Sequence, residues 1–535
     1  MDLLSVRDLV SLAPLSVTLP FLGAAIAFTL IRHRTAQQVI TIVTLSVTLI
    51  IEMLILIAAW DQGAASVALG GWLPPYGINL VVDRLSALML VVSTIVSLAV
   101  LIYATGQGAT DDSRDGPITI FHPTYLVLVA GVSNAFLAGD LFNLFVGFEI
   151  LLTASYVLLT MGSTGPRVRA GVIYMVVSVI SSALFLIAIG MIYSATGTVN
   201  MADLAVKLAD LPEPTQMILH LLLVVAFGIK AAIFPLAFWL PDSYPTAPAP
   251  VTAVFAGLLT KVGVYALIRT ETLLFPSDKF NDVLLTIASL TMVVGILGAI
   301  AQADIKRMLS FTLISHIGYM IYGLGVANEI AVAATVYYVA HHIVVQTGLF
   351  LVVGLIERRG GSANLERLGG LLKISPLLAI LYFIPAMNLA GIPPFSGFLG
   401  KVGLLQGGIA VNTPLGWVGL AAAIVTSVLT LLAVVRVWAR AFWRRPEDAL
   451  RPDALITTTD EKRIRYFNRT ILHPVLVAPT IALIAVGVSL TIFASGLFNY
   501  SGQAARDIIL RTPYIEAVLG DDSGANGSVG VVKEP

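Results

Sequence analysis

Long apolar runs dominate this chain, and they decide which kind of fold is open to it. A helix that crosses a bilayer needs about 20 predominantly apolar residues, and runs of that kind follow one another along most of the 535 residues. Hydrophobic residues make up 57% of the chain and charged residues 12%, against about 25% charged in soluble domains. The sequence therefore predicts an all-α polytopic membrane protein with little room for a soluble domain.

About fourteen transmembrane helices are expected from the apolar runs. The expected ranges are 13–31, 38–60, 80–104, 121–139, 141–161, 170–195, 216–240, 248–270, 281–302, 308–327, 330–356, 375–411 (interrupted), 416–439 and 473–498. The first run lacks a basic segment before it and is followed by further spans, so we interpret it as a retained helix.

Composition excludes several ways of powering a membrane protein. The chain has no cysteine, which excludes disulfides, iron–sulfur clusters and thiolate metal sites. It also lacks a haem-attachment motif and a convincing nucleotide-binding glycine loop. We therefore expect no cofactor and no metal centre.

The distribution of basic residues predicts an orientation. With the N-terminus outside, most of the 31 lysines and arginines fall in loops on the cytoplasmic side, as the positive-inside rule requires. An even number of spans then places both termini outside the cytoplasm. We expect a multi-pass protein of the cell membrane.

Four ionisable residues interrupt the apolar runs: Glu149, Lys230, Lys261 and Lys401. A charge at the centre of a bilayer costs at least about 2.5–3.5 kcal/mol, so such residues usually serve a pathway or a partner. One carboxylate and three amines in these positions indicate movement of protons or cations. The alternative is a static ion pair that fixes helix packing.

Two of the expected spans are interrupted by proline. Pro235 and Pro241 follow Lys230, and Pro393 and Pro394 precede Lys401. Proline removes a backbone donor and breaks a helix, which a membrane protein tolerates where the backbone lines a buried or wet cavity. A pair of interrupted spans in two halves of a transporter indicates inverted repeats with the site at the break. Simple kinks are the alternative.

The two interruptions are five spans apart, so a second copy of the repeat would enter the membrane upside down. We therefore expect two inverted five-helix repeats with two broken helices. The expected organisation is 1–120 for helices 1–3, 121–270 and 281–440 for the two repeats, 441–472 for a basic cytoplasmic loop, 473–498 for helix 14, and 499–535 for a flexible external tail.

The charged residues suggest a relay. A nearby carboxylate favours the charged form of a buried amine, so Glu149 and Lys230 would form a switch that holds or releases a proton. Lys261 would pass the proton on through water. Histidine can shuttle protons through both ring nitrogens, although a buried histidine is as often a hydrogen-bonded packing residue.

Three histidines lie on the expected route. His316 lies in FTLISHIGYM, and His341 and His342 lie in YYVAHHIVVQTGLF. Adjacent helical residues point about 100° apart, so we expect only one of His341 and His342 to face the interior, and favour His342. A fourth histidine, His220, starts its span and is expected at the membrane interface. Asp83 and Arg84 are expected to neutralise each other.

Several segments resemble a known family. LFNLFVGFEILLTASY around Glu149, GIKAAIFPLAFWLPDSYPTAPAPVTAVFAGLLTKVGVYAL, ADIKRMLSFTLISHIGYM and AGIPPFSGFLGK are similar to the antiporter-like proton-translocating subunits shared by respiratory complex I and Mrp-type cation/proton antiporters. The resemblance covers roughly residues 80–440. Within the family, SYPTAPAP and TKVGVYAL look most like the D-type subunit of Mrp Na⁺/H⁺ antiporters.

The resemblance implies a fourteen-helix fold with two inverted repeats. It implies a Glu–Lys pair (Glu149 and Lys230), a central lysine (Lys261) and a terminal lysine (Lys401), with other antiporter subunits as partners and protons and Na⁺ as cargo. One position departs from the pattern. Several relatives carry lysine four residues after the helix-11 histidine, where this chain has Gln346, so the step between Lys261 and Lys401 must depend on His342, hydroxyls and water.

The sequence leaves three functions open. The leading one is a membrane subunit of a multi-subunit Na⁺/H⁺ antiporter, which is a transporter and not an enzyme. The second is the equivalent proton-pumping subunit of complex I or a membrane-bound hydrogenase, where the local chemistry would be the same. The third is a structural scaffold, which predicts that activity survives replacement of Lys230 or Glu149.

Overall fold

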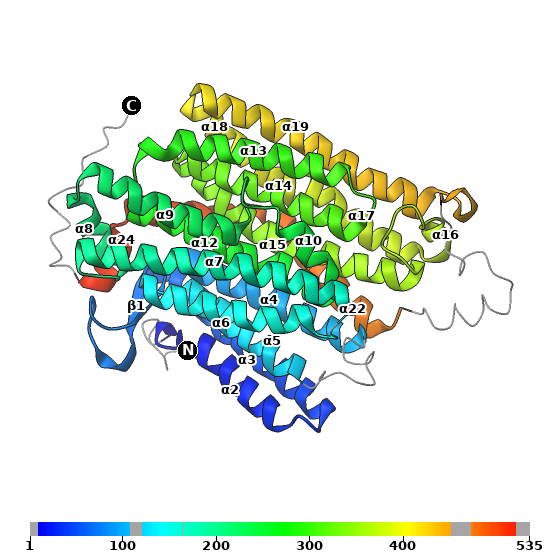
Figure 1. Cartoon of the computed structure of the whole chain (residues 1–535), viewed down its shortest axis with the longest axis horizontal. Helices are drawn as coiled ribbons and strands as arrows, with labels where there is room; N and C mark the ends of the chain where they lie inside the picture. Colours follow the sequence, from blue (N-terminus) through cyan, green and yellow to red (C-terminus); the bar gives the residue numbers. More distant parts are fainter. Residues whose placement is uncertain (1–8, 108–119, 163, 451–471, 521–535) are drawn as a thin grey trace.

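The computed structural model describes residues 9–107, 120–162, 164–450 and 472–520. Its helices run side by side along the long axis of one bundle (Figure 1). The expected basic loop lies mostly, and the end of the expected tail wholly, outside the described residues.

Within the described ranges, eleven helical segments are long and apolar enough to cross a membrane. They are α3 (Arg34–Gln62), α4 (Arg84–Gln107), α6 (Leu141–Thr160), α7 (Gly165–Thr196), α9 (Glu213–Ala231), the segment α11 (Ala249–Val254), η5 (Phe255–Leu259), α12 (Thr260–Arg269) and η6 (Thr270–Leu274), the segment η7 (Asp278–Phe280) and α13 (Asn281–Ile300), α14 (Ile305–Val326), α15 (Glu329–Gly360), the segment α19 (Pro414–Val437) and η8 (Trp438–Trp443), and α22 (Pro474–Ile492). Shorter apolar helices are α2 (Leu15–Thr29), α5 (Phe121–Leu137) and α17 (Pro376–Ala390).

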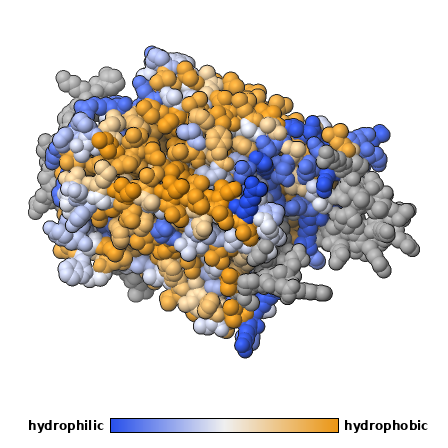
Figure 2. Space-filling view, in the orientation of Figure 1, coloured by the Kyte–Doolittle hydropathy of each residue, from blue (hydrophilic) through white to orange (hydrophobic). Residues whose placement is uncertain are grey.

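The outer surface of the bundle is apolar over its middle. Figure 2 shows a broad hydrophobic band with hydrophilic residues gathered towards the two ends. On α7, for example, Val179 and Ile187 are each 54% exposed. Soluble monomers rarely expose apolar area on this scale, whereas a bilayer requires it. The chain is a multi-pass membrane protein, as expected.

The centre of the bundle is formed by α14 and α15. Helix α15 packs against α4, α11, α14, α17, α18 (Ser396–Val411), α22 and α23 (Ala494–Leu510). Because neighbours surround it, its side chains are buried on every face over most of its length. Polar residues on these two helices are therefore withdrawn from lipid.

Two helices end in mid-bundle. Helix α9 stops at Ala231, and Ala232 then takes a left-handed conformation with φ of 60°. Helix α17 stops at Ala390, Gly391 takes φ of 80°, and α18 begins at Ser396. Lys230 lies in the last turn of α9. The helix that was expected over 216–240 ends at Ala231, because the chain from Ala232 to Trp239 is not helical.

Some elements were not expected. An antiparallel hairpin joins β1 (Ala65–Ala68) and β2 (Asn79–Val82) in the register Ala65 opposite Val82, so the chain is not wholly α. The remaining short helices are η1 (Leu69–Gly71), α8 (Met201–Lys207), η3 (Leu208–Asp210), α10 (Leu240–Ser243), η4 (Tyr244–Thr246), α16 (Leu371–Ile374) and η9 (Pro446–Asp448).

The expected tail from residue 499 is corrected by the structure. Helix α23 and helix α24 (Thr512–Leu519) fold back on the bundle. The side chains of Tyr500, Ala504 and Ile508 are buried, and their four-residue spacing places them on one helical face. This segment is an amphipathic helix. Its many polar residues kept it from being predicted as a helix from hydropathy.

Candidate functional site

The ionisable residues singled out in the sequence are withdrawn from solvent and lipid. Lys261, His316, His341 and His342 have no exposed surface, and Lys230 and Lys401 are 7% and 5% exposed. Glu149 is half-buried. They come from α6, α9, α12, α14, α15 and α18, of which α12, α14 and α15 are almost wholly buried in the bundle.

Glu149 and Lys230 are joined through a serine. Ser182 on α7 donates a hydrogen bond to Glu149 Oε1, and Lys230 Nζ donates to Ser182 Oγ at 2.8 Å. A second bond runs from Lys230 Nζ to the Ser178 carbonyl at 3.3 Å. The carboxylate and the amine are therefore connected by a hydroxyl, which can accept from one partner and donate to the other.

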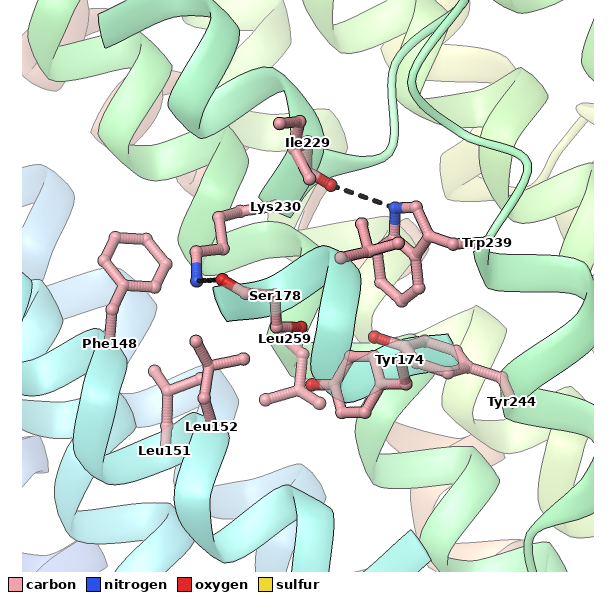
Figure 3. Close-up of a pocket in the computed structure, with 11 residues that line it drawn as sticks. Phe148, Leu151, Leu152, Tyr174, Ser178, Ile229, Lys230, Trp239, Tyr244 and Leu259 are labelled. Carbon is pink, nitrogen blue, oxygen red and sulfur yellow. Dashed lines mark hydrogen bonds between the residues drawn. The ribbon is translucent and has the colours of Figure 1, made fainter. Parts of the chain in front are cut away.

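Ile229 and Lys230, at the end of α9, line a small cavity. Figure 3 shows the Lys230 side chain between Phe148 and Ser178, with Trp239 and Tyr174 on the other side. Trp239 Nε1 donates to the carbonyl of Ile229 at 3.2 Å and so satisfies one of the last carbonyls of the helix. The cavity measures about 10 Å³, which is close to what one water molecule needs.

Lys261 follows a turn of π-helix. Its Nζ donates to the Ala256 carbonyl at 2.7 Å, within the π-helical residues Phe255–Leu259. Such turns are rare and often mark functional sites. Two glycines allow close approach of neighbouring helices. A Cβ on Gly263 would lie 2.6 Å from the Ala231 nitrogen, and one on Gly257 would lie 2.2 Å from Thr347 Oγ1.

These contacts place α12 between the two other groups of site residues. Gly263 brings the helix of Lys261 against the end of α9, which carries Lys230, and Gly257 brings the preceding turn against α15, which carries His341 and His342. Within the described residues, no hydrogen bond is recorded directly between Lys261 and either Lys230 or His342.

The three histidines gather with Tyr338. The Tyr338 hydroxyl and His316 Nδ1 are hydrogen-bonded at 2.7 Å. The rings of His316 and His342 are 5.1 Å apart, and those of Tyr338 and His341 are 5.3 Å apart. His341 Nδ1 is hydrogen-bonded to Ser396 Oγ at 2.9 Å. The cluster therefore extends from α14 through α15 to the start of α18.

The expectation that only one of His341 and His342 would face the interior is wrong. Both are fully buried. His341 is hydrogen-bonded to Ser396, and the ring of His342 packs against the ring of His316. That expectation holds only for a helix with one face towards lipid. Because α15 is surrounded by other helices, its two adjacent histidines both face protein.

Lys401 lies beyond the second helix interruption. Its Nζ donates to the carbonyl of Ala390 at 2.9 Å and to Ser427 Oγ at 3.0 Å, with a longer bond of 3.3 Å to the Leu389 carbonyl. It also lies 5.0 Å from the centre of the Tyr319 ring. The carbonyls at the end of α17 thus hold the amine, as an unwound helix end holds a cation.

Ser396 and Asn388 connect His341 to the same helix end. Ser396 Oγ contacts both His341 Nδ1 and Asn388 Oδ1, the latter at 3.2 Å. The next residue, Leu389, accepts from Lys401. Asn388 and Ser396 therefore link the histidine cluster to the helix end whose carbonyls hold Lys401.

Among the residues that the structure describes, several buried polar atoms in this region have no hydrogen-bond partner. They are Nε2 of His316 and His341, both ring nitrogens of His342, Oε1 of Gln346 and Oγ1 of Thr260. Buried polar atoms are nearly always hydrogen-bonded to protein or to water, so these atoms mark positions that can bind water between Lys261 and the histidines. Gln346 Nε2 itself donates to the Leu309 carbonyl at 2.8 Å.

Sequence reasoning missed the hydroxyl groups that connect the site. Ser182, Tyr338, Ser396 and Ser427 each contact an ionisable residue. A signal existed for one of them, since Ser178 and Ser182 are four residues apart in an apolar helix and so share a face. The other three partners were not marked by any such pattern.

Two family models match the chain. Residues 138–430 match the family described as NADH:quinone oxidoreductase/Mrp antiporter, transmembrane, and residues 74–107 match the family of the N-terminus of chain 5 of NADH-ubiquinone oxidoreductase (complex I).

The chain is 38% identical to the D-type subunit of the Na(+)/H(+) antiporter of Alkalihalophilus pseudofirmus over 95% of its length and 99% of that protein. It is 32% identical to the D-type subunit of the Bacillus subtilis antiporter over 94% and 98%. A chain in the structure of the Mrp complex from Dietzia sp. superposes with a TM-score of 0.86 at 31% identity, covering 96% of this chain and all of that one. The protein therefore belongs to the family of NADH:quinone oxidoreductase/Mrp antiporter membrane subunits, and within it to the D-type subunits of Na⁺/H⁺ antiporters.

Proposed function

We propose that this chain is the proton-conducting D-type subunit of a multi-subunit Na⁺/H⁺ antiporter in the cell membrane. The observation that carries the proposal is the hydrogen-bonded chain Glu149–Ser182–Lys230 inside an apolar bundle. The relatives named as D-type subunits of Na⁺/H⁺ antiporters support the cation and the multi-subunit assembly.

Glu149 and Lys230 act as the switch of the pathway. Burial disfavours the ammonium form of Lys230, and the carboxylate of Glu149 favours it. A small displacement of α7 would break the bond of Ser182 to one partner and change how firmly Lys230 holds its proton. The helix interruption directly after Lys230 provides a backbone that can move without disturbing a continuous helix.

Lys261 and the histidines form the central part of the relay. Lys261 lies on a helix that contacts both the end of α9 and α15, and the unpartnered nitrogens of His316 and His342 can exchange protons with bridging water. From His341, Ser396 leads to the helix end that holds Lys401. Lys401 is the far terminus of the relay.

Two inverted five-helix repeats build this pathway. We place the repeats over α5 to η6 and over α13 to η8, each with one broken helix. The eleven long and three shorter apolar helices of the described ranges support this organisation. Asp140 and Asn200 form an isolated bridge, and so do Asp304 and Asn364, at the same separation in sequence. Asp140 caps α6 and Asp304 caps α14, which supports the correspondence.

The repeat relates the surroundings of Lys230 to the histidine cluster. At the separation that relates Asp140 to Asp304, Ser178 corresponds to His342 and Ser182 corresponds to Gln346. Ser178 and Ser182 are the partners of Lys230. Gln346 thus occupies the position of a bridging group, and its free Oε1 can accept a hydrogen bond there.

Both termini are proposed to lie outside the cytoplasm. Arg358 and Arg359 at the end of α15, and Arg444 and Arg445 beyond η8, lie at the end of the bundle that carries α16 (Figure 1). A basic end of this kind faces the cytoplasm.

Replacement of Glu149 by glutamine tests the proposal. Glutamine keeps the size of the side chain and can still bond to Ser182, but it cannot stabilise an ammonium, so Na⁺-driven proton movement should fall by about tenfold or more. The measurement is dye-reported proton release in everted vesicles containing the whole complex. Glu329→Gln, at a half-exposed ion pair with Arg506, is the control. Wild-type transport by an assembled Glu149→Gln complex would refute the proposal.

A further inference from the structure

A cavity is lined by residues of α8, α9 and the segment around η7, and by Arg511 just before α24. These elements lie at the end of the bundle opposite α16 (Figure 1). The cavity measures about 220 Å³, and its lining includes Gln216, His220, Phe275, Lys279 and Arg511. This volume holds several water molecules.

His220 forms a buried hydrogen bond with Glu271 at this cavity. Its Nε2 lies 2.8 Å from Glu271 Oε1, and both side chains are less than a tenth exposed. The ring stacks on Phe275 with centroids 4.6 Å apart and also contacts Phe280 at 4.6 Å. His220 is therefore fixed between two rings, with one side facing the cavity.

Other charged groups at the cavity have their own partners. Among the described residues that line it, these groups are Glu213, Lys279 and Arg511. Glu213 and Lys279 form an exposed ion pair at 2.6 Å, and Arg511 donates to the Ala205 carbonyl. Glu271 is thus the charged group that contacts His220.

The pair occupies the outer ends of the two helices that carry the lysines. His220 precedes Lys230 by ten residues on α9, and Glu271 follows Lys261 by ten residues on the continuous helix of α12 and η6. Ten helical residues span about 15 Å. Because His220 and Glu271 are in contact, the pair lies about that far along both helices from the two lysines, on the side of the cavity.

The polar side chains between the His220–Glu271 pair and the lysines lie on α12 and not on α9. Between His220 and Lys230 the sequence is LLLVVAFGI, without a polar side chain. On α12, Tyr265 and Arg269 follow Lys261 at successive turns, with Arg269 Nε 3.1 Å from the Tyr265 hydroxyl.

Arg269 also corrects an expectation about the neighbouring charges. It is paired with Asp83 at 2.6 Å, so Asp83 is not neutralised by Arg84 as expected. Arg84 pairs with Asp507 instead. Because Asp507 lies on α23, which the sequence did not predict as a helix, this pairing could not be foreseen.

We propose that His220 and Glu271 form a proton-exchange site that connects this cavity to Lys261. The inference rests on the proposed function. A hydronium ion in the cavity gives its proton to the imidazole and remains as water, and the imidazolium passes the proton on Nε2 to the Glu271 carboxylate. The carboxylic acid then releases it to water beside α12. In the other direction the same steps deliver protons to the cavity.

The variants His220→Gln and Glu271→Gln test the site in the whole complex. Glutamine at 220 can still donate a hydrogen bond to Glu271, but its amide cannot take up and pass on a proton as an imidazole can. Na⁺-driven proton flux in vesicles is measured while the pH on the cavity side is varied. We expect about a tenfold slower flux for both variants and a flattened pH profile. Glu329→Gln, at the same end of the bundle, should match the wild type.

Two outcomes separate this inference from the proposed function. If Lys230→Ala abolishes exchange while assembled His220→Gln and Glu271→Gln complexes keep the wild-type rate and pH profile, the exchange site is overturned and the proposed function stands. If Lys230→Ala keeps full exchange, the proposed function fails. Co-purification of the other subunits confirms assembly, and Glu271→Asp, which retains a titrating carboxylate, should recover the pH profile if the role is proton exchange.

Discussion

Replacement of Lys230 by alanine should lower Na⁺-driven proton movement by about 100-fold. Lys230 is the amine that Ser182 connects to Glu149, and alanine offers no group that could take up a proton at the end of α9. The measurement is the initial rate of dye dequenching in everted vesicles after addition of Na⁺, normalised to the amount of assembled complex.

The control for Lys230→Ala separates charge from proton transfer. Arginine at 230 keeps a positive charge but does not deprotonate in proteins, so Lys230→Arg should be as inactive as the alanine variant. Lys207→Ala, at an exposed pair with Asp203, should behave like the wild type. An active Lys230→Arg complex would show that the charge alone is needed and that the proton does not pass through this residue.

Replacement of Lys401 by alanine should cause a loss of similar size. Lys401 is held by the carbonyls at the end of α17 and by Ser427, and no other ionisable side chain on α18 can replace it. Without it the relay ends at His341, and protons cannot leave the second half of the bundle. We expect about a 100-fold lower exchange rate, measured in the same vesicle assay.

Lys401→Glu offers a sharper comparison at this position. Glutamate restores a titrating group of opposite charge, so a relay role predicts that part of the activity returns in Lys401→Glu but not in Lys401→Ala. Lys373→Ala, on the short helix α16 and exposed, is the matched control. Equal and complete loss in the alanine and glutamate variants, with assembly intact, would indicate a structural role for the lysine charge.

The apolar runs predicted the class of fold and most of its helices. Helix α7 was expected over 170–195 and is Gly165–Thr196, and α15 was expected over 330–356 and is Glu329–Gly360. Both are longer because their first and last turns include polar residues, and hydropathy alone does not detect polar turns. The same limit hid α23, where only one face of the helix is buried.

The buried charges were found from sequence, but their connections were not. A lysine in an apolar run is conspicuous because its burial is costly. The serines and tyrosines that contact these lysines and histidines cost little to bury and are common in membrane helices, so Ser396 and Ser427 carried no signal. The burial of both His341 and His342 depended on neighbours of α15 that come from distant parts of the chain.

The most direct test of the account is proton exchange by a Lys261→Met complex. The central claim is that Lys230 and Lys401 belong to one relay in series, and Lys261 is the residue between them, fully buried and in contact with the Ala256 carbonyl. Methionine fills a similar volume without charge, so the fold should persist. If the relay is continuous, Lys261→Met vesicles should lose exchange to the same extent as Lys230→Ala vesicles. Exchange comparable with the wild type would show that the two halves conduct independently and would contradict the account.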